Sequence, residues 1–120
     1  MPFDGKSADY KTNTTADVLR RARALIDSPE KWCKDKLSDG AHSYCVRGAL
    51  IKAIAGSVDE FLDDVHIRSL QSAERALGFP GYDGKHGEPL LPEWNNARDR
   101  NHPEIMAAFD KAIALAESEG

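Results

Sequence analysis

The sequence predicts an all-α protein, a compact bundle of four to five helices. Apolar residues recur at helical spacing in several segments, and residue pairs typical of helix ends flank those segments. No segment shows the apolar–polar alternation of a strand over a useful length. We therefore expect one helical domain over residues 13–118, which follows a polar arm over residues 1–12 and is built around an apolar helix at about residues 43–55.

The first helix is predicted to begin at Thr14 or Thr15. Thr14 and Asp17 resemble a capping pair, in which a side chain at the helix start satisfies a free backbone N–H group. Apolar residues then fall on one face of the helix: Val18, Leu19, Ala22, Leu25 and Ile26. Ser28-Pro29 is predicted to end the helix, because a residue before proline avoids helical geometry.

The segment from Ser43 to Ala55 is predicted to be the most buried helix, ended by Gly56. Its apolar positions are Cys45, Val46, Ala49, Leu50, Ala53 and Ile54. Gly48 costs about 1 kcal/mol relative to alanine in a helix, so close packing against a backbone or an aromatic ring would explain it. We expect the terminal helix to lie against this one, with Phe109 and Trp94 near Gly48.

A third helix is predicted after Gly56. Ser57 and Glu60 form a capping box, apolar residues continue at helical spacing to Leu77, and Gly78 is a natural stop. A break over residues 64–67 is an alternative to one continuous helix.

Residues 78–92 form a Gly/Pro-rich loop. Glycine recurs at every third position from Gly78 to Gly87, but the run is too short for a collagen helix and is read as consecutive turns. Loops of this length in compact domains are often functional.

The final helix has the strongest start signals. Asn101 or His102 caps it, Pro103 occupies the first turn and Glu104 completes a capping box. Its apolar face consists of Ile105, Met106, Phe109, Ala112, Ile113 and Ala116. A short helical turn is predicted before it, from Trp94 to Arg98.

Composition and charge narrow the classes of function. The chain has 41% hydrophobic residues, 16 Lys and Arg and 20 Asp and Glu, which gives a net charge of −4. This balance disfavours a nucleic-acid binder, which needs a concentrated basic face, and we assign Arg20, Arg21 and Arg23 to a solvated helix surface. No apolar stretch has the form of a signal peptide or a membrane span, so we expect a cytoplasmic protein without a cofactor.

These motifs resemble a family of uncharacterised small proteins from bacteria and their phages. Its pattern is an amphipathic helix, a tryptophan turn, a Cys-x-x-Gly-Ala-Leu helix and a Trp-Asn-Asp segment before a terminal helix. The matching positions here are Trp32, Cys45, Gly48, Ala49, Leu50, Trp94, Asn95 and the helix from Pro103. Where the pattern has aspartate, this chain has Asn96. The resemblance implies a fold and core positions, and it carries no established activity.

Cys45 is the candidate nucleophile. It is expected in the first turn of its helix, where the helix dipole lowers the pKa of a thiol, and His42, His86 or His102 could act as base. Cys45 also falls on the apolar stripe, which favours a buried, inert thiol. Cys33 and Cys45 could pair or stay free, and we expect two reduced thiols because the domain can build its own core.

Metal binding is disfavoured by spacing. Cys33, His42 and Cys45 are separated as Cys-x8-His-x2-Cys, which lacks the two tight pairs of common zinc sites. An acidic face at residues 59–64 is interpreted as solvated surface at the start of a helix. We expect no bound metal.

A polar-aromatic cluster and the glycine loop are the candidate binding surface. Its members are Trp94, Asn95, Asn96 and Arg98, with Tyr82, Asp83 and His86 from the loop. The alternative is that Trp94 fills the core while an asparagine caps a turn. The leading hypothesis is a non-catalytic binding or regulatory protein with a protein or small-molecule partner, such as an inhibitor carried by a phage or mobile element. A small Cys–His hydrolase or acyl transferase using Cys45 is the alternative.

Overall fold

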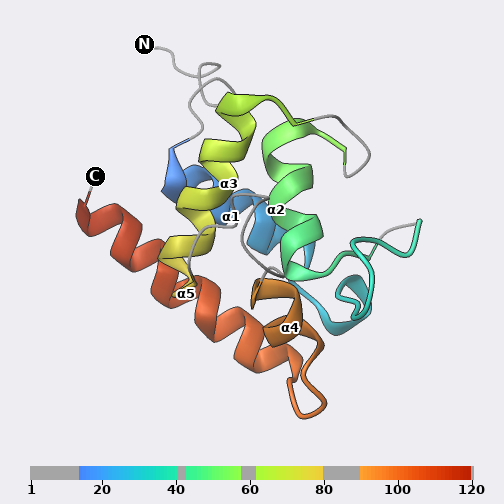
Figure 1. Cartoon of the computed structure of the whole chain (residues 1–120). Helices are drawn as coiled ribbons and strands as arrows, with labels where there is room; N and C mark the ends of the chain where they lie inside the picture. Colours follow the sequence, from blue (N-terminus) through green and yellow to red (C-terminus); the bar gives the residue numbers. More distant parts are fainter. Residues whose placement is uncertain (1–13, 41–42, 58–61, 80–89, 120) are drawn as a thin grey trace.

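The computed structural model describes residues 14–40, 43–57, 62–79 and 90–119, and in these ranges it confirms the all-helical prediction. In chain order the elements are α1 (Thr15–Leu25), the 3-10 helix η2 (Pro29–Lys31), α2 (Val46–Ala55), α3 (Asp64–Ala76), α4 (Leu90–Asn96) and α5 (His102–Glu119) (Figure 1). The short helix α4 lies at the end of the bundle where α2 and α5 begin (Figure 1). None of the described helices is both long and apolar enough to cross a membrane.

The predicted starts of α1 and α5 are confirmed, whereas α1 ends at Leu25, before the predicted stop at Ser28-Pro29. The Thr14 hydroxyl oxygen accepts a hydrogen bond of 3.2 Å from the Asp17 backbone N–H. At α5 the box is reciprocal, because Asn101 Oδ1 accepts from the Glu104 N–H and Glu104 Oε1 accepts from the Asn101 N–H, both at 3.0 Å. Gly56 ends α2 with φ of +87°, a left-handed conformation that glycine adopts without steric cost.

Helix α3 begins later than the Ser57–Glu60 pair predicts, at the segment where a break was the alternative. Asp63 is its N-cap and accepts a 2.9 Å hydrogen bond from the His66 N–H. That bond to the charged carboxylate lowers the pKa of Asp63. Residues 58–61, with Glu60 of the predicted box, lie outside the described residues.

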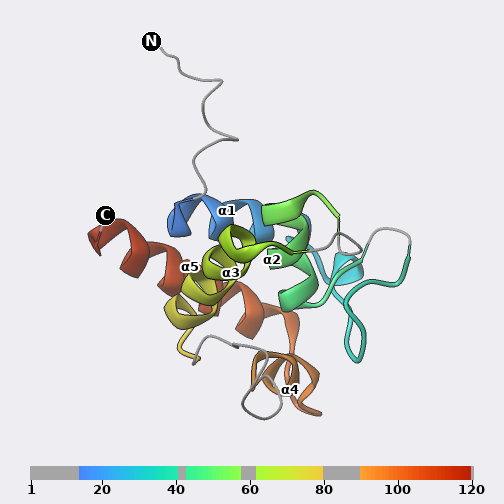
Figure 2. The ribbon, with the colours of Figure 1, turned by 45° about the horizontal axis from the view of Figure 1, so that its top comes forward.

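All five described α-helices contribute buried residues to the core, Leu91 being that of α4, and α1 contacts α2, α3 and α5. The prediction that α2 is strongly buried is confirmed, because six of its ten residues are buried. The prediction that the terminal helix packs against α2 is wrong, because α5 lies against α1 and α3. Figures 1 and 2 both show α3 between α2 and α5. The apolar face of α1, with Val18, Leu19 and Ala22 buried, supplies the contact with α5 that we expected from α2.

An ion pair joins α2 and α3 inside the bundle. Arg47 Nε lies 3.4 Å from Glu74 Oε2, and the Glu74 side chain is only 1% exposed. A buried carboxylate is costly unless it is paired, so this contact fixes the two helices relative to each other.

Gly48 marks a close approach between α2 and a loop. A Cβ atom at this position would lie 1.9 Å from the Leu37 carbonyl oxygen. The expectation of close backbone packing is therefore confirmed, but the neighbour is Leu37 and not the rings of Phe109 and Trp94. The Leu37 carbonyl also accepts a 3.1 Å hydrogen bond from the Cys45 N–H, which holds the loop against the start of α2.

Candidate functional site

The side chain of Asn95 lies at the centre of the predicted polar-aromatic cluster and is completely buried. Its Oδ1 accepts hydrogen bonds from Trp32 Nε1 at 2.7 Å and from the Val46 N–H at 3.0 Å. Its Nδ2 donates to the Cys33 carbonyl at 3.1 Å and to Asn96 Oδ1 at 3.0 Å. Both donors and both acceptor positions of the amide are used, so Asn95 joins α4 to segment 32–46 and has no polar atom left for a ligand.

Asn96 and Lys34 extend the same junction to the surface. Asn96 Oδ1 also accepts from the Asp35 N–H at 2.7 Å. Lys34 Nζ donates to the Ala97 carbonyl at 2.8 Å and to the Arg98 carbonyl at 3.5 Å, and it lies 5.5 Å from the Trp32 ring centroid. The predicted site residue Arg98 is exposed, and the contact described here is made by its backbone. These bonds hold the loop after Trp32 on the C-terminal end of α4.

Trp94 is partly buried and packs between two side chains. Its ring centroid is 5.7 Å from that of Phe79, and the Arg100 guanidinium carbon lies 4.5 Å over the ring. Arg100 Nε also donates to the Trp94 carbonyl at 3.0 Å. A cation held over an indole by this geometry is attracted to the ring face. Arg100 therefore covers one face of the Trp94 ring, and Phe79 packs against the ring as well.

Cys45 lies in an apolar, hydrogen-bonded setting at the start of α2. It is the N-cap residue and is 4% exposed, and its sulfur accepts a 3.3 Å hydrogen bond from the Gly48 N–H. Burial raises the pKa of the Cys45 thiol above its ordinary value and outweighs the lowering by the backbone N–H groups of Gly48 and Arg47. The catalytic cysteine of a hydrolase or acyl transferase, which must attack its substrate at neutral pH, needs the opposite shift.

Of the three histidines proposed as a base for Cys45, the structure describes only His102. His102 is the first residue of α5, and its Nε2 lies 2.7 Å from the Ile26 carbonyl oxygen. Because a carbonyl only accepts, that nitrogen carries a proton and cannot receive one from a thiol. The His102 ring also lies 6.3 Å from the Trp32 ring. His42 and the loop residues Tyr82, Asp83 and His86 lie outside the described residues.

The described residues contain no group of three or more His, Cys, Asp or Glu side chains placed to hold a metal ion. Cys33 and Cys45 are both free thiols. The acidic side chains of Asp63 and Asp64 are exposed at the start of α3, as expected for solvated residues near a helix N-terminus.

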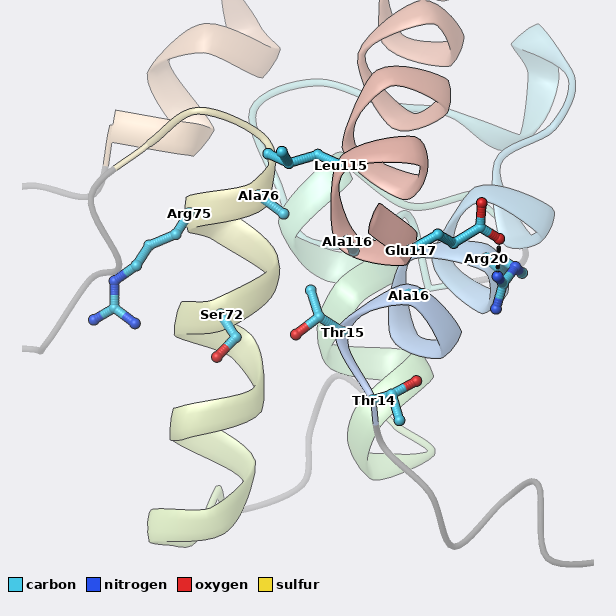
Figure 3. A pocket seen from close by; sticks show the side chains of 10 residues that line it. All are labelled: Thr14, Thr15, Ala16, Arg20, Ser72, Arg75, Ala76, Leu115, Ala116 and Glu117. Carbon is cyan, nitrogen blue, oxygen red and sulfur yellow. Dashed lines mark hydrogen bonds and ion pairs between the residues drawn. The ribbon is translucent and has the colours of Figure 1, made fainter. Parts of the chain in front are cut away.

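A pocket of about 650 Å³ is lined by Thr14 and by residues of α1, α3 and α5, and by none of α4. The start of α1, the second half of α3 and the end of α5 surround it, as Figure 3 shows. Thr15 of α1 and Ser72 of α3 lie on opposite sides of the opening, and Leu115 reaches from α5 toward α3 (Figure 3). Arg20 is turned toward Glu117 and forms an ion pair with it. We call this the helix-end pocket.

The helix-end pocket was not among the sites that the sequence predicted. Thr14 and Thr15 were interpreted only as helix-start residues, and Ser72 is one polar position within an amphipathic helix. The available signal was Leu115, an apolar residue outside the predicted apolar face of the terminal helix. It is 45% exposed in the structure.

The fold and these sites define a class of protein, a small all-helical domain with an internally hydrogen-bonded junction at α4 and an open pocket lined by α1, α3 and α5. The chain belongs to a family of unknown function (DUF6197), whose pattern matches residues 11–115. This confirms the expected membership of an uncharacterised family. No curated protein and no solved structure matches the chain.

Proposed function

We propose that this protein is a non-catalytic binding protein and that its ligand enters the helix-end pocket. The observation that carries the proposal is the pocket itself, whose volume of about 650 Å³ falls in the range of small-molecule sites. A site of this kind combines apolar walls with a few polar groups that orient the ligand.

The side chains around the pocket indicate the chemistry of the ligand. Hydroxyl groups come from Thr14, Thr15 and Ser72, and apolar surface comes from Ala76, Ala116 and Leu115. Hydroxyl groups both donate and accept hydrogen bonds. A small molecule, or the end of a peptide, with a short apolar part and hydroxyl, carbonyl or amide groups fits this lining. Charged groups also border the pocket, because Arg20 pairs with both Asp17 and Glu117 and Arg75 is part of the lining.

The proposal moves the binding site away from the predicted cluster at Trp94. All hydrogen-bonding positions of the Asn95 amide are occupied by groups of the protein, and Arg100 lies over one face of the Trp94 ring. The leading hypothesis of a binding or regulatory protein is retained, including its version as an inhibitor carried by a phage or mobile element.

The experiment is a titration of the isotope-labelled protein with a library of small alcohols, amides and carboxylic acids, followed by two-dimensional NMR. We expect a subset of compounds to shift the backbone amide signals of Thr15, Ser72 and Leu115. Ser72→Trp should abolish these shifts by filling the pocket, while Arg68→Trp, at an exposed position of the same helix, should preserve them. Shifts that persist unchanged in Ser72→Trp, or a library that leaves all three amides unmoved, would refute the assignment.

The alternative of a Cys–His enzyme is tested through thiol reactivity. In Cys33→Ser protein, Cys45 is the remaining cysteine, and we expect it to react with iodoacetamide at pH 7 more slowly than a cysteine in an unstructured peptide. The reason is that burial both raises the pKa and blocks access. A reaction faster than the peptide would support the enzyme hypothesis instead.

A further inference from the structure

The two cysteines each directly follow one residue of a β-bridge between neighbouring extended segments. Trp32 and Tyr44 form a parallel β-bridge, in which the Tyr44 N–H donates to the Lys31 carbonyl at 2.9 Å and the Cys33 N–H donates to the Tyr44 carbonyl at 3.0 Å. In a parallel register the pair after 32 and 44 is 33 and 45. Directly opposed residues of such a pair project to the same side. Extended by one residue, this register would make Cys33 and Cys45 cross-chain neighbours with their side chains on one face.

The amide of Asn95 sets the spacing just beyond this pair. If the ladder continued, the Val46 N–H would donate directly to the Cys33 carbonyl. Instead Asn95 Oδ1 accepts from Val46 at 3.0 Å and Asn95 Nδ2 donates to Cys33 at 3.1 Å, so the amide stands between the two chains. Parallel chains lie about 4.8 Å apart, and a disulfide spans Cα atoms roughly 4.4–6.8 Å apart. The inserted amide widens the distance between the two chains just beyond Cys33 and Cys45. The usual distance between parallel chains is at the short end of the Cα–Cα range of disulfides.

The two thiols differ in how a reagent can reach them. Cys33 is partly exposed, and its Sγ donates to the Lys36 carbonyl at 3.7 Å. Cys45 is 4% exposed. Its pKa is raised mainly by burial, and negative charge on Cys33 raises it further, so the two thiols lie within electrostatic reach of each other. A reagent in solution therefore meets Cys33 first, and Cys45 is placed to react only within the protein.

We propose that Cys33 and Cys45 are a reversible redox pair that forms an intramolecular disulfide with a small-molecule disulfide such as oxidised glutathione. The Cys33 thiolate attacks one glutathione sulfur, forms a mixed disulfide and releases one glutathione thiolate, which takes up a proton. The Cys45 thiolate then attacks the Cys33 sulfur and expels the second glutathione. In sum, two protein thiols and one glutathione disulfide give one protein disulfide and two glutathione thiols.

Oxidation would change the start of α2. The Cys45 sulfur accepts from the Gly48 N–H, and its backbone N–H is bonded to Leu37. A sulfur tied to Cys33 is held toward segment 32–35 and away from its capping position. The redox state is thereby coupled to the first turn of α2 and to the loop that packs on Gly48.

The test is incubation of the full chain with oxidised glutathione at about pH 8, acid quenching and intact-mass measurement. We expect the wild type to lose two hydrogens without gaining mass from glutathione, and reduced glutathione in excess should reverse the change. Cys45→Ser should accumulate one glutathione adduct, because the resolving thiol is missing. Cys33→Ser should stay unmodified for at least tenfold longer, because the remaining thiol is buried.

A matched control separates register from nearness in sequence. The double variant Cys33→Ser with Lys36→Cys keeps two thiols, one of them exposed and closer in sequence to Cys45, but out of register. We expect it to accumulate the mixed glutathione adduct at position 36 rather than an internal disulfide. A stable adduct on wild-type Cys33, or an equally fast internal disulfide in the control, would overturn the proposal.

Discussion

Replacement of Asn95 by alanine should be among the most damaging single changes in this protein. The side chain is completely buried and makes three hydrogen bonds to segment 32–46, to Trp32, Cys33 and Val46. With a net contribution of about 1 kcal/mol for each bond, their loss amounts to about 3 kcal/mol. The unfilled space adds about 1 kcal/mol. We therefore expect the free energy of unfolding to fall by about 3–4 kcal/mol.

Urea unfolding followed by far-ultraviolet circular dichroism measures this loss, since a domain of this size is expected to unfold in one step. Asn95→Leu is the companion variant, because it restores side-chain volume but none of the hydrogen bonds. We expect it to be about as unstable as Asn95→Ala. Asn101→Ala serves as the matched asparagine control, and loss of its helix cap should cost only about 1 kcal/mol.

A decrease in the urea midpoint for Asn95→Ala that is no larger than the decrease for Asn101→Ala would refute this estimate. It also fails in part if Asn95→Leu recovers wild-type stability, because the contribution of Asn95 would then come from packing and not from its hydrogen bonds.

Three further changes probe other features of the fold. Gly48→Ala should lower the free energy of unfolding by about 2 kcal/mol or more, measured by urea unfolding, because its Cβ would meet the Leu37 carbonyl oxygen; an unchanged midpoint would contradict that contact. Glu74→Ala should cost about 3 kcal/mol by leaving Arg47 without its buried partner, whereas the exposed control Glu93→Ala should leave the urea midpoint nearly unchanged. Asp63→Asn keeps a capping side chain but removes the charge whose pKa is lowered in the folded state. The wild type should therefore be the more stable protein above the unfolded-state pKa and lose that advantage as the pH falls through the folded-state pKa. Equal urea midpoints for the two proteins near neutral pH would argue against this role of the carboxylate.

The parts of the fold that the sequence predicts well are decided by neighbours in the chain. The caps at Thr14 and Asn101 depend on side chains within three residues, and the stop at Gly56 depends on one residue's freedom to adopt a positive φ. These signals are local, so a single sequence displays them. The start of α3 is harder to predict, because Ser57 and Asp63 both have side chains that can cap a helix. Neither residue by itself shows which of the two is the cap.

The parts that sequence reasoning missed depend on distant contacts. The Asn95 amide meets groups 49 to 63 positions away, and a side chain with the same polarity could equally face solvent. Gly48 within a helix indicates a close contact at that position, but the sequence does not indicate that the contacting residue is Leu37. The isolated bridge between Trp32 and Tyr44 has no alternating pattern that would reveal it, since it consists of one residue pair.

The hydrogen bonds of Asn95 also impose an order on biosynthesis. A ribosome adds residues from the N-terminus at about 5–20 per second, so the residues of α1 and α2 are synthesised before position 95. During that interval water must satisfy the Val46 amide and the Trp32 indole, because their protein acceptor does not yet exist. The junction between segment 32–46 and α4 can therefore close only after position 95 has been synthesised, although all of segment 32–46 is made earlier.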